Sequence, residues 1–270
     1  MRIKTKDNYV SVCGKKLSVR TLTQKSGRNK PTIVFLHEGL GCIELWKDIP
    51  MLLAEATGLN AVIYDRQGYG KSDSLDLPRP NNYLEIEARH YLPELLKQLN
   101  IYEPILIGHS DGATIALIYA ALHPVRLLIT EAAHVIVEEI TIKGVQQAVN
   151  YCKSNNTLNK LKKYHGDKAE DVFWSWATIW LNKSFKNWNV RHFLNQIKCP
   201  CLLIQGENDP YASNDQFQLI LKDIGNNANG ELLAECAHAP HFEAKEMTLD
   251  LMLNFMDHHL LLNQNITNSI

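Results

Sequence analysis

Short apolar runs that alternate with helical patterns constrain the fold of this chain more than any other feature. Four such runs occur in its first half, at 32–36 (TIVFL), 60–65 (NAVIYD), 104–109 (PILIGH) and 126–133 (RLLITEAA). Continuous apolar runs of this length are typical of strands that are buried on both faces. Patterns with helical spacing separate them, over 42–57, 83–99 and 111–122. This alternation predicts an α/β fold with a mostly parallel sheet and helices on both of its faces.

Further strand patterns frame this alternation. Residues 9–24 alternate apolar and polar side chains around Gly14, which predicts a β-hairpin before the first buried strand. Strand patterns return at 199–209 and 231–236, and 243–262 has the pattern of a closing helix. The later strands therefore extend the same predicted sheet.

One long segment interrupts the strand pattern. Residues 135–196 are polar and helical in pattern, and aromatic side chains gather near the end of the segment. We interpret this segment as an insertion after the fourth parallel strand. The chain then divides into an α/β domain, formed by 1–134 and 197–270, and a helical insertion at 135–196.

Composition and charge exclude several classes of protein. Apolar residues make up 45% of the chain, which is enough for a full core, and the formal net charge is −1. That balance indicates neither a nucleic-acid partner nor a membrane surface. No apolar run approaches the roughly 20 residues of a membrane span, and no apolar stretch follows the basic N-terminus as in a secretory signal. We therefore expect a cytoplasmic protein.

The cysteines point the same way. The six cysteines match neither a disulfide-rich framework nor a CxxC metal site. We expect reduced thiols in the cytoplasm and no metal site.

The stretch GHSDG, residues 108–112, carries the strongest chemical signal. It fits Gly-x-Ser-x-Gly, follows a predicted buried strand and precedes a predicted helix. At such a turn the serine hydroxyl projects clear of the backbone, and side chains two residues away would collide, which explains Gly108 and Gly112. The pattern predicts that Ser110 is a nucleophile.

A serine hydroxyl needs a general base at neutral pH. His109 is adjacent to Ser110, but neighbours on a tight turn point in different directions, so we do not expect it to be the base. With a nucleophile at this kind of turn, the acid and then the histidine follow later in the chain. His238, after the strand pattern at 231–236, is the candidate base, and His241 is its rival.

The acid is expected between the nucleophile and the base. Asp209 follows the strand pattern at 199–209, where a carboxylate can orient an imidazole ring, and Glu207 is its rival. Because the carboxyl ends of parallel strands share one edge of the sheet, these candidates should meet Ser110 at that edge.

An oxyanion hole needs two hydrogen-bond donors near the nucleophile. The backbone N–H of Asp111, the residue after Ser110, should be one of them. The second should come from the loop 37–41 after the first buried strand, where glycines let the backbone approach a substrate oxygen. Gly39 is the preferred donor, with Glu38 and Leu40 as alternatives.

Five stretches in this order resemble the α/β-hydrolase fold superfamily over nearly the whole chain. They are HEGLG (37–41), DRQGYGKSD (65–73), GHSDG (108–112), IQGENDP (204–210) and AHAPHFE (237–243). The chain is most similar to the branch of serine esterases, ring-cleavage-product hydrolases and pimeloyl-carrier methyl esterases. By this resemblance Asp209 and His238 match the catalytic acid and histidine, ahead of Glu207 and His241. Asp65 and Arg66 are expected to hold their loop and not to act on a substrate.

The sequence departs from the family pattern at two places. Glu38 replaces the glycine that usually follows the histidine of the oxyanion loop, which brings a carboxylate close to the site. Ala237 replaces the usual glycine before the histidine base. Trp46, nine residues after His37, is a feature that resembles the haloalkane dehalogenase and epoxide hydrolase branch. Those enzymes, however, place an aspartate where this chain has Ser110.

The insertion at 135–196 matches the place where these enzymes carry a helical cap, or lid. Phe173, Trp176 and Trp180 fall on one helix face by their spacing. They pack a small core within the cap, or Trp176 and Trp180 line an apolar acyl pocket together with Glu38, Leu40 and His109. His134 and Glu138 are further candidates to face that pocket, without a catalytic role.

Together these features predict a serine hydrolase that cleaves a carboxylic ester of small to medium acyl size through an acyl-enzyme intermediate. Thioesterase, lactonase and C–C bond hydrolase activities use the same chemistry and remain alternatives, and a ligand-binding receptor of this fold with slow turnover ranks below them. The expected partner is a small-molecule ester, with no cofactor. The sequence does not distinguish a monomer from a homodimer.

Overall fold

The computed structural model describes residues 3–27 and 30–267, and an eight-stranded sheet forms its centre. The strands are β1 (Lys4–Val12), β2 (Lys15–Thr23), β3 (Thr32–Leu36), β4 (Asn60–Tyr64), β5 (Ile105–His109), β6 (Leu127–Glu131), β7 (Cys201–Gly206) and β8 (Ala228–Leu233). Their order in the sheet is β1-β2-β4-β3-β5-β6-β7-β8. β1 and β2 form the predicted hairpin, β2 pairs antiparallel with β4, and all other pairs are parallel. The predicted α/β class with a mostly parallel sheet is confirmed.

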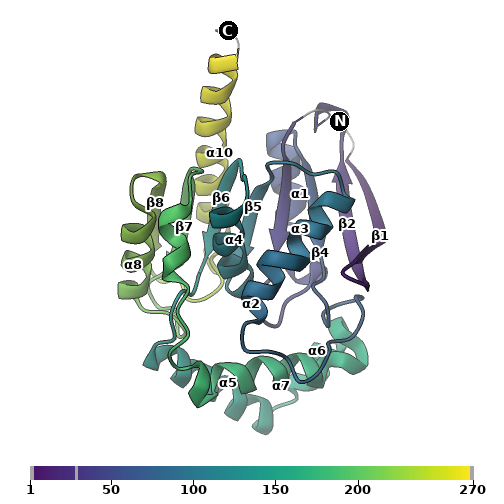
Figure 1. Cartoon of the computed structure of the whole chain (residues 1–270), viewed down its shortest axis with the longest axis vertical. Coiled ribbons are helices and arrows are strands. Elements are labelled where there is room, and N and C mark those ends of the chain that lie inside the picture. Colours follow the sequence, from purple (N-terminus) through teal and green to yellow (C-terminus); the bar gives the residue numbers. More distant parts are fainter. Residues whose placement is uncertain (1–2, 28–29, 268–270) are drawn as a thin grey trace.

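Helices cover both faces of this sheet (Figure 1). They are α1 (Ile49–Thr57), α2 (Tyr83–Ile86), α3 (Leu92–Gln98), α4 (Asp111–Leu122), α5 (Glu139–Ser154), α6 (Thr157–His165), α7 (Ala169–Trp180), α8 (Asn214–Ile224), α9 (Pro240–Glu243) and α10 (Lys245–Thr267). α1 and α10 share one apolar cluster with the sheet, whereas α3, α4 and α8 share another on the opposite face. In the described part of the chain no helix is long and apolar enough to cross a membrane.

The segment between β6 and β7 lies beyond one end of the strands, at the bottom of Figure 1. It contains α5, α6 and α7, which pack on one another. One backbone bridge, from Ile136 to Asn189, joins the two ends of this segment. The carboxyl ends of β5, β6 and β7 face it, so side chains at these strand ends lie between the sheet and the segment.

The structure corrects the predicted bounds of several elements. The last strand is Ala228–Leu233 and not 231–236, because its register with β7 ends at Leu233 and the chain turns at Glu235, which has a φ of 55°. The predicted helix at 83–99 is divided by a π-helical turn at Glu87–Tyr91 into α2 and α3. The predicted helix at 42–57 begins as a 3-10 turn, Ile43–Trp46, before α1. α8 has no counterpart among the predicted elements.

Candidate active site

Ser110 lies on a sharp turn between β5 and α4. Its backbone has a φ of 53° and a ψ of −116°, a region that non-glycine residues rarely adopt. The turn is packed closely: a Cβ on Gly108 would overlap the backbone of Gly112, and a Cβ on Gly112 would overlap the carbonyl oxygen of Leu36. The glycines therefore provide the space that the turn requires, and the Ser110 hydroxyl faces a cavity.

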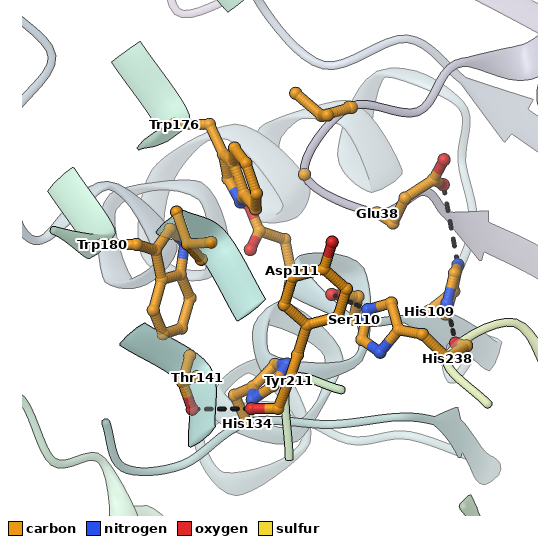
Figure 2. Close-up of a pocket in the computed structure, with 13 residues that line it drawn as sticks. Glu38, His109, Ser110, Asp111, His134, Thr141, Trp176, Trp180, Tyr211 and His238 are labelled. Atoms are coloured by element: carbon orange, nitrogen blue, oxygen red, sulfur yellow. Dashed lines mark hydrogen bonds and ion pairs between the residues drawn. The ribbon is translucent and has the colours of Figure 1, made fainter. Parts of the chain in front are cut away.

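His238 bridges Ser110 and Asp209 (Figure 2 shows His238 beside Ser110). Its Nε2 lies 3.0 Å from Ser110 Oγ, and its Nδ1 lies 2.8 Å from Asp209 Oδ2 and 2.9 Å from Oδ1. The acid-side contact requires Nδ1 to carry the proton, which leaves Nε2 free to accept the Ser110 proton. The sequence therefore placed nucleophile, base and acid candidates on three separate strand ends, and the structure brings them together.

The Asp209 carboxylate is buried and fully engaged. It accepts hydrogen bonds from Gln205 Nε2 at 2.7 Å and from the Tyr211 N–H at 2.8 Å, besides its contacts with His238. Burial raises the pKa of Asp209, but the hydrogen bond from His238 and the charge of its ring outweigh burial and lower the pKa to about 2. The Asp209 carboxylate is therefore ionised at neutral pH and can stabilise a positive charge on the His238 ring.

The two rivals lie elsewhere. Glu207 is exposed, and its backbone N–H pairs with the carbonyl of Leu233. His241 is buried, and both its backbone N–H (2.9 Å) and its Nδ1 (2.7 Å) donate to Glu131 Oε2. Neither side chain lines the cavity beside Ser110, because Glu207 is exposed to solvent and His241 is bound to Glu131.

The loop 37–41 borders the cavity beside Ser110. Gly39 and Leu40 line it, as does Asp111. Arg66 fixes the start of this loop: its buried guanidinium donates from Nη2 to the carbonyl oxygens of His37 (3.1 Å) and Glu38 (2.7 Å). Arg66 therefore holds the backbone beside Gly39.

His109 turns away from Ser110 and contacts the backbone of His238. Its Nε2 donates to the backbone carbonyl of His238 at 2.7 Å, and its Nδ1 lies 3.7 Å from Glu38 Oε2. Burial lowers the pKa of His109, but the Glu38 carboxylate outweighs burial and raises the pKa to about 9. The same contact with His109 lowers the pKa of Glu38 to about 2, against the opposing effect of its own burial. The two side chains therefore form an ion pair at the rim of the cavity.

The Asp111 side chain is held by neighbours. Its carboxylate, 1% exposed, accepts a hydrogen bond of 2.7 Å from the Tyr83 hydroxyl and lies 3.8 Å from Arg66 Nη1. Tyr83 in turn accepts a hydrogen bond of 3.1 Å from Trp180 Nε1. This chain of contacts ties the turn after Ser110 to α7.

The cavity has a volume of about 250 Å³. Its lining includes Glu38, Leu40, His109, Trp176 and Trp180, the five residues first predicted for the pocket. Figure 2 shows Trp176 and Trp180 on one side and Glu38 on the other. The full lining is Glu38, Gly39, Leu40, His109, Ser110, Asp111, His134, Thr141, Val145, Trp176, Trp180, Tyr211 and His238. Phe173 packs behind Trp176 and does not line the cavity.

Three lining residues were not anticipated from the sequence: Thr141, Val145 and Tyr211. Tyr211 lies two positions after Asp209, a spacing that could have pointed to it. Thr141 Oγ1 donates to the Tyr211 carbonyl at 2.6 Å, so α5 contacts the loop that carries Asp209.

The two further pocket candidates have different places. His134 lines the cavity, where burial and then the nearby His238 lower its pKa to about 3, so its ring is neutral. Glu138 instead lies at the start of α5 and accepts hydrogen bonds from the Ser213 N–H (3.0 Å) and Gln216 Nε2 (2.6 Å). Within residues 3–27 and 30–267, no group of three or more His, Cys, Asp or Glu side chains could hold a metal ion.

Comparisons with known proteins agree with this architecture. A family model described as alpha/beta hydrolase fold matches residues 31–133. Serine hydrolase BPHL of Homo sapiens is 28% identical over 191 residues, which span 67% of this chain and 63% of the human protein. Karrikin insensitive 2 receptor IA of Petunia hybrida is 24% identical over 265 residues, 88% of this chain and 94% of the receptor.

The fold also recurs in solved structures. The enol-lactonase from Burkholderia xenovorans LB400 superposes with a TM-score of 0.73 at 18% identity, covering 93% of this chain and 100% of the lactonase. The matches confirm the predicted family and, at the level of enzyme class, the predicted hydrolase. The chain has the α/β-hydrolase fold, and its residues 31–133 match the family model of that description.

Proposed function

We propose that this protein is a serine hydrolase that cleaves carboxylic esters of small to medium acyl groups. One observation carries the proposal: Ser110 Oγ faces the cavity 3.0 Å from His238 Nε2, while the buried Asp209 holds the opposite side of the same ring at 2.8 Å. A nucleophile, a base with an available nitrogen and an ionised acid are the parts that acyl transfer to serine needs.

The reaction proceeds in two halves. In the first, His238 accepts the Ser110 proton as Oγ attacks the ester carbonyl carbon, and Asp209 stabilises the resulting imidazolium. The oxyanion accepts hydrogen bonds from the N–H groups of Asp111 and Gly39. His238 then protonates the leaving alcohol as the ester C–O bond breaks, and the acyl group remains bound to Ser110. In the second half, His238 deprotonates a water that attacks this acyl-enzyme, and the carboxylic acid is released.

The cavity supports a small substrate. Its volume of about 250 Å³ lies below the roughly 300–1,000 Å³ of pockets for drug-sized ligands. Apolar side chains from Leu40, Val145, Trp176 and Trp180 provide much of its wall. These walls fit the hydrocarbon part of an acyl group.

We propose that residues 135–196 act as the cap of this enzyme over a core of 1–134 and 197–270. The cap supplies Thr141 and Val145 from α5, and Trp176 and Trp180 from α7. All six cysteines are free thiols, in keeping with the reducing cytoplasm that we propose for this protein.

Covalent labelling tests the proposal. The protein is incubated with a fluorophosphonate and with p-nitrophenyl esters of graded acyl length, and the label is located by mass spectrometry. We expect labelling at Ser110 and turnover, and a loss of more than about 10³-fold in kcat for Ser110→Ala. His109→Ala, which removes support for His238 but no reacting group, should lose only about tenfold. An unlabelled, inactive wild type would sink the proposal, and a His109→Ala variant as inactive as Ser110→Ala would sink the assignment of the base.

A panel of substrates separates the alternatives. Thioesters, lactones and substrates for C–C cleavage are offered beside the esters, and kcat/KM ranks them. The similarity to the petunia receptor keeps a binding role as the second candidate. A receptor would acylate at Ser110 yet release product slowly, so a burst of alcohol followed by almost no turnover with every class of substrate would favour it over an enzyme.

A further inference from the structure

His165 joins the inserted segment to two loops of the α/β domain. It is the last residue of α6, and its ring is 1% exposed. Its Nδ1 accepts a hydrogen bond of 2.9 Å from the Gly70 N–H. Its Nε2 donates to the carbonyl oxygen of Leu40 at 3.0 Å. The ring therefore lies between the loop after β4 and the loop after β3.

These two partners fix the protonation of the ring. The Gly70 N–H can only donate and the Leu40 carbonyl can only accept, so the imidazole must be neutral with its proton on Nε2. Adding a proton at Nδ1 would place one N–H against another and remove one of the two bonds.

The surroundings favour the neutral form. Burial lowers the pKa of His165, and the Lys168 ammonium lowers it further, whereas the Leu40 carbonyl and the Glu38 carboxylate oppose them. Lys168 is held beside the ring by the carbonyl oxygens of Tyr69 and Ser72. The Tyr69 ring contacts His165 edge-on, with centroids 5.9 Å apart, and it also contacts the buried His37 ring, with centroids 4.8 Å apart.

The contact with Leu40 bears on the loop that carries Gly39. Before Gly39, the carbonyls of His37 and Glu38 are held by Arg66, which belongs to the α/β domain. After Gly39, the Leu40 carbonyl is held by His165, which belongs to the inserted segment. The backbone on either side of the Gly39 N–H is thus anchored from two different parts of the molecule.

A second side chain of the inserted segment contacts the same loop. A Cβ on Gly39 would lie 2.6 Å from Trp176 Nε1, so the α7 side chain packs directly on the glycine backbone. Trp176 limits how far this backbone moves, and His165 supplies its directed hydrogen bond.

We propose that His165 is a positioning residue that couples the inserted segment to the oxyanion hole. It holds the Leu40 carbonyl, and through it the Gly39 N–H, only while α6 is in place and only as a neutral imidazole. This inference rests on the proposed function, because it takes Gly39 as an oxyanion donor.

Hydrogen exchange tests the anchoring without any chemistry. The full-length wild type is compared with His165→Ala, His165→Gln and the control His192→Ala, whose exposed ring lies in the same inserted segment. Glutamine offers one acceptor and one donor but does not titrate. We expect the peptide that contains residues 37–41 to exchange about tenfold faster in His165→Ala, and to stay near the wild-type rate in the other two. Equal exchange in His165→Ala and the wild type would overturn the proposal.

Reactivity tests the consequence for the oxyanion hole. We expect His165→Ala to lower the rate of fluorophosphonate labelling and kcat by roughly 10- to 100-fold, with little change in KM for a short ester, because the loss affects the transition state. His165→Gln should restore most of the rate. A His165→Ala variant with faster exchange but an unchanged labelling rate would overturn the positioning role.

The pH profile distinguishes positioning from a general structural role. Protonation of His165 at low pH removes one of its two loop contacts, so the acid side of log kcat/KM against pH should fall more steeply in the wild type than in His165→Gln, whose side chain does not titrate. Acid limbs of equal steepness in the two proteins would show that the charge of this ring has no effect on the site. A wild type that fluorophosphonate does not label would refute the proposed function but not the role of His165. Hydrogen exchange would still decide whether His165 holds the loop.

Discussion

At the scale of single residues, Gly112 lies where the first turn of α4 packs against Leu36, the last residue of β3. A Cβ there would overlap the Leu36 carbonyl oxygen, which is backbone and cannot turn aside. We expect Gly112→Ala to lower the free energy of unfolding by roughly 1–3 kcal/mol and to reduce labelling of Ser110, because α4 must move away from β3. Urea unfolding measures the first effect.

Gly14→Ala is the matched control for this substitution. Gly14 has a φ of 77° but open space around its Cα, and it lies far from Ser110 in the hairpin turn. Gly14→Ala should lower the free energy of unfolding by about 1 kcal/mol, because alanine is strained at this φ, and it should leave labelling of Ser110 unchanged. Equal stability of Gly112→Ala and the wild type would show that the turn has more freedom than its packing implies.

The Glu38–His109 pair makes stability depend on pH. The pKa of His109 is raised to about 9 in the folded protein, above the roughly 6.5 of an unfolded chain. Its contribution to stability is therefore complete below about pH 6.5 and is lost as the pH rises through about 9. We expect Glu38→Gln to cost on the order of 2 kcal/mol at pH 6 and much less at pH 10.

Unfolding of wild type and Glu38→Gln in urea at both pH values measures this difference. Lys4→Gln in β1, an exposed position, serves as a control for loss of one charge and should show no such dependence. A constant difference between wild type and Glu38→Gln at pH 6 and pH 10 would contradict the ion pair.

Residue patterns alone predicted much of the candidate site and failed where long-range pairing decides. Ser110 could be singled out because its motif needs a strand before it and a helix after it. Spacing alone could not decide between His238 and His241. In the structure His241 is bound to Glu131, which lies 110 residues away in the sequence. A partner of this kind leaves no local pattern.

At the scale of elements, α7 presents two tryptophans to the cavity and one away from it. We expect Trp176→Ala to enlarge the cavity and to raise kcat/KM for hexanoyl and octanoyl esters relative to acetyl esters by about tenfold. Trp174→Ala, on the same helix but outside the cavity lining, should leave the ratio unchanged. Kinetics with the p-nitrophenyl ester series measure the ratio. An unchanged preference in Trp176→Ala would contradict the proposal that α7 lines an acyl pocket.

Elements were predictable where burial is uniform. β5, for example, is buried at every position and reads as a continuous apolar run. β8 lies at the edge of the sheet, and only its last position is buried. Its first residues therefore lack an apolar pattern, and the strand was predicted too far along the chain, at 231–236. α8 was missed, although Ser213 caps its start by accepting a hydrogen bond from the Gln216 N–H. Capping signals of this kind are short and compete with ordinary turns.

At the scale of the whole molecule, one apolar cluster joins the inserted segment to the sheet. Val145, Phe173 and Trp180 of the segment belong to the same buried cluster as Leu36 and Leu106 of the sheet. The spacing of the aromatic residues left open whether they form a separate small core. In the structure they belong to one buried cluster that also contains residues of α4 and of the strands. Sequence patterns give the apolar face of a helix but not the surface that covers it.

A continuous cluster predicts cooperative unfolding of the segment with the α/β domain. The chain has five tryptophans, of which Trp46 lies in the α/β domain and the others lie between 174 and 188. Trp46 is buried against Phe35, and its indole N–H has no hydrogen-bond partner, so Trp46→Phe removes its fluorescence without breaking a polar contact. The remaining emission then reports on the inserted segment alone, while far-ultraviolet circular dichroism reports on all helices and strands.

We expect the two signals of Trp46→Phe to change at the same urea concentration, because exposing the segment also exposes the cluster beneath it. Loss of tryptophan emission at a lower urea concentration than the loss of helical signal would show instead that the segment unfolds first and that its contacts with the sheet are weak.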